Sequence, residues 1–125
     1  ALKLWFVLRR FGAVGVRAHV RSGMDLAEHF ASRVRRSQVI ELAAPVSLSL
    51  ICFRRRVPSG LDGTSDDAMQ SELLEAVKAK GIFIIHSKLG GKKILRLACG
   101  GIEQSMRDVD AAFDIIETAA FGLAA

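Results

Sequence analysis

Tyrosine is missing from this chain of 125 residues, and tryptophan occurs only once, at Trp5. Proteins that bind single-stranded RNA on a sheet stack the bases on exposed aromatic side chains. The strand-like runs of this sequence offer only Phe53 and Phe83 for that purpose. The net charge of +5 is compatible with an anionic partner. An RNA-binding α+β sheet therefore stays open as an alternative, but we expect no nucleic-acid partner.

Cysteine is also scarce, since the chain has only Cys52 and Cys99, each within an apolar strand-like run. This is typical of buried free thiols in a reducing compartment, so we expect a cytoplasmic protein. A disulfide between neighbouring strands is the alternative. The cysteines and histidines lack the spacing of a zinc site, and we expect no metal. No apolar run approaches the roughly 20 residues of a membrane-spanning helix, so we expect no membrane partner.

Proline is limited to Pro45 and Pro58, and the sequence between breaks has clear periodicity. It predicts an α+β domain of about four mostly antiparallel strands covered by helices. Gly90-Gly91 predicts the turn of a hairpin. Ser65 or Asp66 is the predicted N-cap of the third helix, and Gly81 its end. Helices are expected over 2–11, 14–36, about 66–80 and about 105–120, and strands over 39–42, 46–54, 82–85 and 94–99.

Apolar positions define the expected buried faces. In the strand over 46–54, apolar residues occur at both even and odd positions and so on both faces. This pattern predicts a central strand that is covered on both sides. In the helix over 14–36, Val20 and Met24 are assigned to the buried face, and Met106 to that of the last helix. Helix 2–11 has apolar side chains nearly all round, including Trp5 and Phe11, and no N-cap. We expect it to be buried against further protein and cut from a longer helix.

Arg96 is the sharpest candidate functional residue, because it interrupts the apolar run of residues 94–99. It could bind a carboxylate ligand, or form an ion pair with a neighbouring element. His86, near the hairpin turn, is a weaker candidate. The run Arg54-Arg55-Arg56 is interpreted as a solvated entry into the loop 55–66. The residues contain no Ser/His/Asp set and no phosphate-binding glycine loop.

Three segments resemble one protein family: ALKLWFVLRRFG at 1–12, LSLICFR at 48–54 and KLGGKKILRLACG at 88–100. They are similar to the C-terminal part of the group II pyridoxal-phosphate amino-acid decarboxylases, which include aromatic-L-amino-acid, tyrosine and histidine decarboxylases. The resemblance covers nearly the whole chain. The first segment is the most specific and favours the aromatic type.

The resemblance implies a homodimeric fold-type I enzyme that removes the α-carboxylate of an amino-acid substrate, with pyridoxal 5'-phosphate as electron sink. It also implies that residues 1–12 end a connecting helix from a missing large domain, and that 13–125 form the small C-terminal domain. In this family the lysine that holds the cofactor follows a histidine, and this chain has no His-Lys pair. We therefore expect no catalytic or cofactor-binding residue here, and an inactive fragment.

Three positions, Asp110, Arg96 and His86, need separate treatment under this resemblance. Val109-Asp110-Ala111-Ala112 has the letters of the family's cofactor-binding aspartate motif. It lies after the hairpin in an amphipathic helix, so we interpret it as a coincidence and expect Asp110 to face solvent. Arg96 matches an arginine that binds a substrate carboxylate in some members and is structural near the dimer interface in aromatic-specific ones. His86 inherits no role.

The predicted function is thus the C-terminal part of a pyridoxal-phosphate-dependent carboxy-lyase acting on an aromatic L-amino acid. The alternative is a truncated, non-catalytic paralogue that dimerises or binds the full-length enzyme through its exposed apolar helices.

Overall fold

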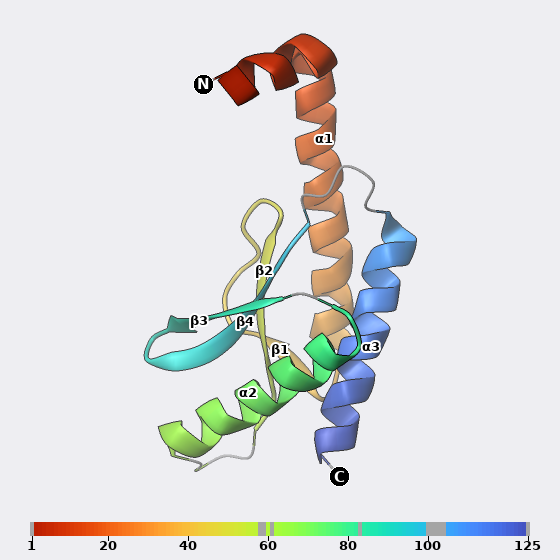
Figure 1. Cartoon of the computed structure of the whole chain (residues 1–125). Coiled ribbons are helices and arrows are strands. Elements are labelled where there is room, and N and C mark those ends of the chain that lie inside the picture. Colours follow the sequence, from red (N-terminus) through yellow and green to blue (C-terminus); the bar gives the residue numbers. More distant parts are fainter. Residues whose placement is uncertain (1, 58–59, 61, 83, 100–104, 125) are drawn as a thin grey trace.

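The computed structural model describes residues 2–57, 60, 62–82, 84–99 and 105–124 of the chain. They form an α+β domain, as predicted (Figure 1). The sheet has the strand order β1-β2-β4-β3, and all neighbouring strands are antiparallel. The elements are α1 (Leu2–Arg36), β1 (Ile40–Leu42), β2 (Leu50–Arg55), α2 (Gly63–Ala79), β3 (Ile85–Leu89), β4 (Lys92–Ala98) and α3 (Met106–Ala124).

Helix α1 is bent at Gly12, where the backbone has φ 70° and ψ 172°. Glycine adopts this positive φ without the steric cost that a side chain imposes. The predicted helix end at Gly12 is therefore confirmed, and the segment before it points away from the body of the molecule (Figure 1). Beyond the bend, the buried residues all lie between Gly23 and Val34. The assignment of Val20 and Met24 to the buried face was wrong, since both are exposed.

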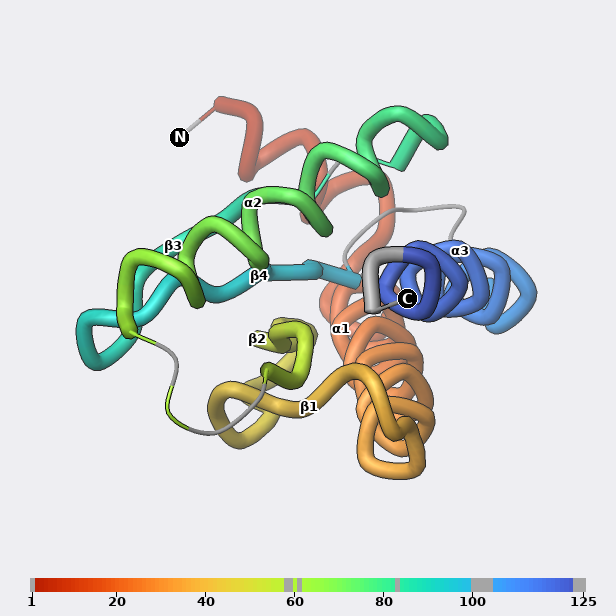
Figure 2. Tube along the Cα trace, turned by 90° about the horizontal axis from the view of Figure 1, so that it is seen from below, coloured from red at the N-terminus to blue at the C-terminus, as the bar shows by residue number. Residues whose placement is uncertain are grey.

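Strand β2 is shorter than predicted. Leu48 adopts a positive φ of 51° and only an isolated bridge joins Ser47 to Leu50, so residues 48 and 49 form a turn and the strand begins at Leu50. The strand is central, as expected, with β1 and β4 on either side. The expectation that both of its faces are covered was right only in part, because on the second face Arg54 is buried but Cys52 is only half-buried. The helices lie on one side of the sheet (Figure 2), where Ile51 and Phe53 are fully buried.

The hairpin has the predicted turn, with φ values of 59° at Gly90 and 78° at Gly91. Positive φ at both central residues matches the twist of the two strands, which explains the Gly-Gly pair. Its first strand, however, is Ile85–Leu89 rather than 82–85. The apolar run before it instead supplies Ile84 to the core, and Phe83 lies outside the described residues.

Three phenylalanines form the centre of the core. The ring of Phe30 in α1 lies 5.5 Å from that of Phe53 in β2 and 5.5 Å from that of Phe113 in α3. These tilted and edge-on arrangements suit aromatic pairs and join two helices to the sheet. In α2, the apolar stripe of Leu73, Leu74 and Val77 is buried in the same core. In α3, Met106 was wrongly assigned to the buried face, because its side chain is exposed.

A buried polar network attaches α2 to the end of β2. Arg54 forms an ion pair with Asp66, and both side chains are 8% exposed. Gln70, one turn further along α2, accepts a hydrogen bond from the backbone N of Arg55 at 2.8 Å and donates to its carbonyl at 3.0 Å. The Gln70 amide thus replaces a neighbouring strand at the end of β2. The interpretation of Arg54 and Arg55 as solvated was wrong, because both are buried.

The N-cap of α2 is Asp62, whose carboxylate accepts a hydrogen bond from the Ser65 backbone N at 2.7 Å. The predicted caps, Ser65 and Asp66, were wrong, because both lie inside the first turn. The helix ends at Ala79, and Gly81 follows with φ 87°, which confirms the predicted stop.

A second group of charges joins α1 to α3. His29 donates to the Asp110 carboxylate at 2.6 Å, and Arg33 donates to Asp110 at 3.0 Å and to Asp114 at 2.8 Å. The hydrogen bond from His29 lowers the pKa of Asp110; partial burial opposes this shift, and Arg33 adds to it. The expectation that Asp110 faces solvent was therefore only half right: its carboxylate is partly exposed but holds two helices together.

Among the described residues, Cys52 is half-buried and Cys99 is buried, and both thiols are free. Burial raises the pKa of the Cys99 thiol. No described helix combines the length and the apolar character needed to cross a membrane. The described part of the chain also contains no group of three acidic, histidine or cysteine side chains that could hold a metal ion.

Gly23 gives a first test of this packing, because a Cβ there would lie 2.4 Å from the carbonyl oxygen of Cys99. We expect Gly23→Ala to lower the free energy of unfolding by about 2 kcal/mol, since α1 must move off the end of β4. The matched control is Gly122→Ala in α3, where a Cβ meets nothing within 4 Å. It should be neutral or slightly stabilising in urea unfolding. Equal changes in the free energy of unfolding for the two variants would contradict the close approach of Gly23 to the carbonyl oxygen of Cys99.

Asp66 gives a second test. Burial raises the pKa of its carboxyl, but hydrogen bonds from Arg54 and Gln70 outweigh this and hold the pKa below its ordinary 3.8. A lowered folded-state pKa contributes stability that is present above the unfolded-state pKa and is lost as the pH falls through the folded one. We expect Asp66→Asn to cost about 3 kcal/mol at neutral pH, because Arg54 is left buried without its carboxylate.

The measurement is urea unfolding between neutral pH and about pH 2, where the variant should lack the acid-dependent loss that Asp66 causes. Glu28→Gln is the control, because its ion pair with Arg35 is exposed and should be worth about 0.5 kcal/mol or less. If Asp66→Asn lowers the free energy of unfolding no more than the control does, the buried pair does not stabilise the fold more than an exposed pair.

Candidate functional site

The side of the sheet away from the helices carries the strongest candidate residue. Cα partners in a ladder point to the same side, and Arg96 in β4 is paired with Cys52 in β2 and with Ile85 in β3. Ile94, two residues before Arg96, shares this side because side chains alternate along a strand. Ile94 is buried there. We call the surface that carries Cys52, Ile85 and Arg96 the open face.

Arg96 is half-buried on the open face, and its guanidinium has no hydrogen bond or ion pair with any described residue. One of the two interpretations of Arg96 was an ion pair with a neighbouring element of the chain. The described residues do not form such a pair. A half-buried guanidinium with apolar neighbours on both sides favours a carboxylate that approaches from outside.

His86 does not belong to the same site. It lies opposite Leu95 in the β3–β4 ladder, and Leu95 points into the core on the helix side of the sheet. His86 is exposed at the edge of that side, so the sheet separates it from Arg96. The structure therefore does not bring the two sequence candidates together.

A hollow of about 300 Å³ is lined in part by Ile94, on the same side of the sheet as Arg96. Arg54 lines it, and its Nε is buried without a hydrogen-bond partner in the described part of the chain. An oxygen of the Glu41 carboxylate lies 3.9 Å from this Nε, which is beyond hydrogen-bonding distance. Sequence reasoning missed this group because it placed Arg54 in solvent. The other lining residues are Glu41, Leu42, Ala43, Leu89, Lys92 and Ile94.

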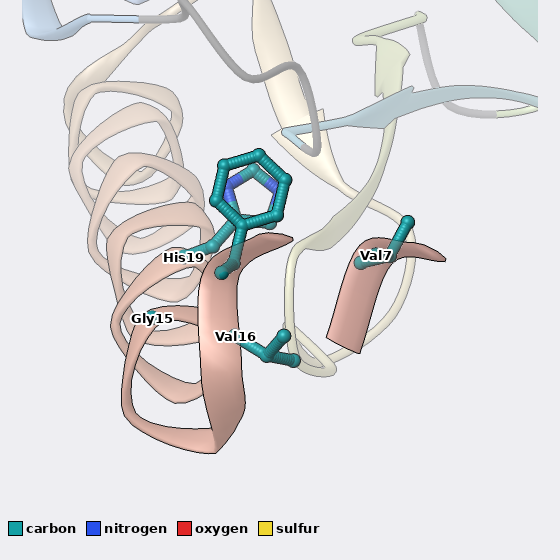
Figure 3. Close-up of a pocket in the computed structure, with 5 residues that line it drawn as sticks. Val7, Gly15, Val16 and His19 are labelled. Carbon is teal, nitrogen blue, oxygen red and sulfur yellow. The ribbon is translucent and has the colours of Figure 1, made fainter. Parts of the chain in front are cut away.

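An apolar cleft of about 280 Å³ lies at the bend of α1, away from Arg96. Figure 3 shows Val7 on the segment before the bend, and Gly15, Val16 and His19 on the segment after it. Phe11 completes the lining. Four of these five side chains are apolar or absent, so the cleft suits an apolar group and offers no catalytic set.

The described residues do not fit the cofactor that the sequence resemblance implies. Pyridoxal phosphate needs a lysine amine held in an enclosed site, because the amine must be desolvated to act as a nucleophile. Five of the six lysines are exposed, and the sixth, Lys93, is half-buried and donates to the Ser71 hydroxyl at 2.7 Å. No lysine of this chain is therefore placed to hold the aldehyde, and we assign no catalytic step to these residues.

The RNA-binding alternative finds no support in the described sheet. Phe53, one of its two strand aromatics, is fully buried in the core and cannot stack on a base. Phe83, the other, lies outside the described residues.

Comparison with known proteins agrees with the fold and with the sequence resemblance. Residues 1–56 match the family model of the pyridoxal-dependent decarboxylase conserved domain. The chain is 35% identical over 121 residues to tryptophan decarboxylase TDC1 of Camptotheca acuminata, covering 96% of this chain and 24% of that protein. It is 34% identical to the 3,4-dihydroxyphenylacetaldehyde synthase of Drosophila melanogaster, covering 94% of this chain and 22% of the relative.

Among solved structures, the chain resembles Catharanthus roseus tryptophan decarboxylase in complex with L-tryptophan, with a TM-score of 0.84 and 31% identity. That likeness covers 98% of this chain and 25% of the other. The chain thus spans about a quarter of the length of the relatives it matches, at their C-terminal end. From these matches and the fold, we conclude that the chain belongs to the pyridoxal-dependent decarboxylase family.

Proposed function

We propose that this chain is the C-terminal part of a pyridoxal-phosphate-dependent enzyme that removes the α-carboxylate of an aromatic L-amino acid. The observation that carries the proposal is the full-length match of the chain to the end of such proteins, in sequence and in fold. The aromatic class is supported by relatives named for tryptophan and for a dihydroxyphenyl aldehyde. Because the second relative is named as an aldehyde synthase, an aldehyde is the alternative to an amine as the product.

In this proposal the catalytic centre lies in the part of the protein that precedes residue 1. Pyridoxal phosphate supplies an electron sink for the loss of the carboxylate. None of the six lysines of this chain is enclosed, so we place the lysine that holds the cofactor in that preceding part. Residues 1–12 end a connecting helix from a large domain, 13–125 form the small domain, and the enzyme is a homodimer. A cytoplasmic location is part of the proposal, since free thiols suit a reducing compartment.

Arg96 has a defined place in this proposal. Its guanidinium is half-buried and has no partner among the described residues, so it can bind a carboxylate that another part of the enzyme or the substrate supplies. The aromatic-type resemblance favours an ion pair at an interface over the substrate carboxylate. Its neighbours Cys52 and Ile85 are suited to such an interface, because they extend the apolar surface beside the charge.

A second candidate function is a non-catalytic module that binds the full-length enzyme or a second copy of itself. The observation that favours it is the exposed apolar segment before the bend of α1, where Trp5 and Phe6 are both more than half exposed. The coding sequence upstream of residue 1 separates the two functions. A frame that continues into a His-Lys segment supports the enzyme, and a start codon near Ala1 supports the module.

The proposed reaction predicts that the full-length protein, with pyridoxal phosphate, releases carbon dioxide from an aromatic L-amino acid. The 125-residue chain alone should not. When it is mixed with pyridoxal phosphate and reduced with borohydride, mass spectrometry should find no adduct specific to one lysine, because no lysine is enclosed. A single trapped lysine in the short chain would refute the placement of the cofactor site upstream. Product analysis distinguishes an amine from an aldehyde.

Arg96→Lys in the full-length enzyme tests the role of Arg96, since lysine keeps the charge but loses the paired donors of the guanidinium. We expect weaker dimerisation or a lower Tm with little change in KM. A raised KM with unchanged assembly would instead identify Arg96 as a ligand of the substrate carboxylate. The control is Arg56→Lys, whose ion pair with Glu41 at 3.4 Å is exposed and should matter by about 0.5 kcal/mol or less.

A further inference from the structure

The hollow of about 300 Å³ that Arg54 lines lies near the turn between β3 and β4. Lys92 stands four residues before Arg96 in β4, and side chains alternate along a strand, so Lys92 points to the side of Arg96. Its ladder partner Leu89 shares that side, and both line the hollow. Arg54 in β2 and its ladder partner Glu41 in β1 line it from the other two strands. The turn lies on the far side of the sheet from α1 (Figure 1), so this site is remote from the bend of that helix.

Arg54 brings unused hydrogen-bond donors to the hollow. Its side chain is 8% exposed, and its Nη2 donates to Asp66. Its Nε is buried without a partner, and its Nη1 donates to no described residue. A guanidinium has five N–H donors, and a donor that is taken out of water without an acceptor costs free energy. An acceptor that enters the hollow and reaches this guanidinium is therefore favoured.

Lys92 gives the hollow one positive charge that no carboxylate of the described chain offsets. Its side chain is exposed and forms no hydrogen bond or ion pair with any described residue. The other charges occur in pairs: Arg54 with Asp66, and Arg56 with Glu41 at 3.4 Å. The surplus is therefore a single positive charge, which favours an anion of single charge over a neutral or doubly charged ligand.

The rest of the lining is apolar. It consists of Leu42, Ala43, Leu89 and Ile94, of which Leu89 is 47% exposed. A ligand that covers Leu89 removes apolar surface from water, which an inorganic anion cannot do. The volume is at the lower end of the range of ligand sites. These features together fit a small organic anion with an apolar body.

We propose that the hollow is a binding site for a small monocarboxylate with an apolar body, of which 3-phenylpropionate is a simple example. The carboxylate accepts hydrogen bonds from Nη1 of Arg54 and from Nζ of Lys92, as carboxylates do from cationic donors. The apolar body lies on Leu89 and Ile94. Because the site is open and small, we expect a dissociation constant on the order of 1 mM for 3-phenylpropionate.

The same groups discriminate against an amino acid or an amine. An amino acid carries an ammonium group beside its carboxylate, where Arg54 and Lys92 would repel it. Glu41 does not offset this repulsion, because it is already paired with Arg56. An amine has no carboxylate for the two cations to bind. The ligand is therefore neither the substrate nor the amine product of the proposed reaction, and the inference does not rest on the proposed function.

Titration of the ¹⁵N-labelled 125-residue chain with 3-phenylpropionate, followed by NMR, tests the site directly. We expect saturable shifts of the backbone amides of Glu41, Leu89 and Lys92. L-phenylalanine adds only the ammonium group, 2-phenylethylamine lacks the carboxylate and acetate lacks the apolar body. Each should bind at least about tenfold more weakly. Binding of L-phenylalanine as tight as that of 3-phenylpropionate overturns the proposal, as does the absence of saturable shifts.

Two lysines that flank the same turn provide a matched pair of variants. Lys92 lines the hollow, whereas Lys88 is the ladder partner of Lys93 and so lies on the other side of the sheet. Both side chains are exposed, so Lys92→Met and Lys88→Met should leave the Tm nearly unchanged. Lys92→Met should weaken the binding of 3-phenylpropionate about tenfold, because one charged donor is lost, and Lys88→Met should not. Equal affinities of the two variants overturn the proposal.

The full-length protein and its Lys92→Met variant are titrated with 3-phenylpropionate in the same way, by ligand-observed NMR. We expect the same loss of affinity, of about tenfold, as in the short chain. A ligand that bound only at the catalytic centre would not respond to Lys92→Met. Equal binding by the two full-length proteins therefore overturns the proposal, and it assigns the hollow to contact with the rest of the polypeptide. A full-length protein that shows the expected loss but releases no carbon dioxide refutes the proposed function and leaves the binding site intact.

Discussion

The ion pair between Arg54 and Asp66 determines how the sheet and its helices are assembled. It is buried between the last residues of β2 and the first turn of α2, where Gln70 also occupies the backbone groups of Arg55. Because α2 is held at this end, its apolar stripe reaches the core beside β4 and its other end contacts α3. The cost of burying two charges is offset by these hydrogen bonds, which fix one position of α2.

This arrangement places the helices on the same side of the sheet and leaves the open face to other protein. Arg96 lies there without a partner among the described residues, between an apolar strand residue on each side. The exposed apolar segment before the bend of α1 is a second such surface, at a distance from the first. Two separate uncovered surfaces are compatible with the proposed larger polypeptide, of which this chain would form a part, since it matches about a quarter of its relatives' length.

The sequence predicted the order of the elements because local signals determine it: Gly12, Gly81 and Gly90-Gly91 occupy positive-φ positions, and helical periodicity is strong in α1 and α3. It failed where tertiary contacts decide. The first strand of the hairpin lies at 85–89 because β4 pairs with those residues, although 82–85 is more apolar. Arg54 was misplaced because its carboxylate partner is twelve residues away on another element. The position of Arg96 in a strand was predictable, whereas its lack of a partner among the described residues was not.

The position of β4 has a consequence for the way the chain is made. It is an inner strand of the sheet, between β2 and β3, yet it is the last strand in the sequence. Until residues 92–98 have left the ribosome, β2 has one unpaired edge, and α2 has only part of the surface on which it packs. An unpaired apolar edge is prone to join other chains. Synthesis that stops before the hairpin turn at Gly90 would therefore leave a product prone to aggregation rather than a smaller stable domain.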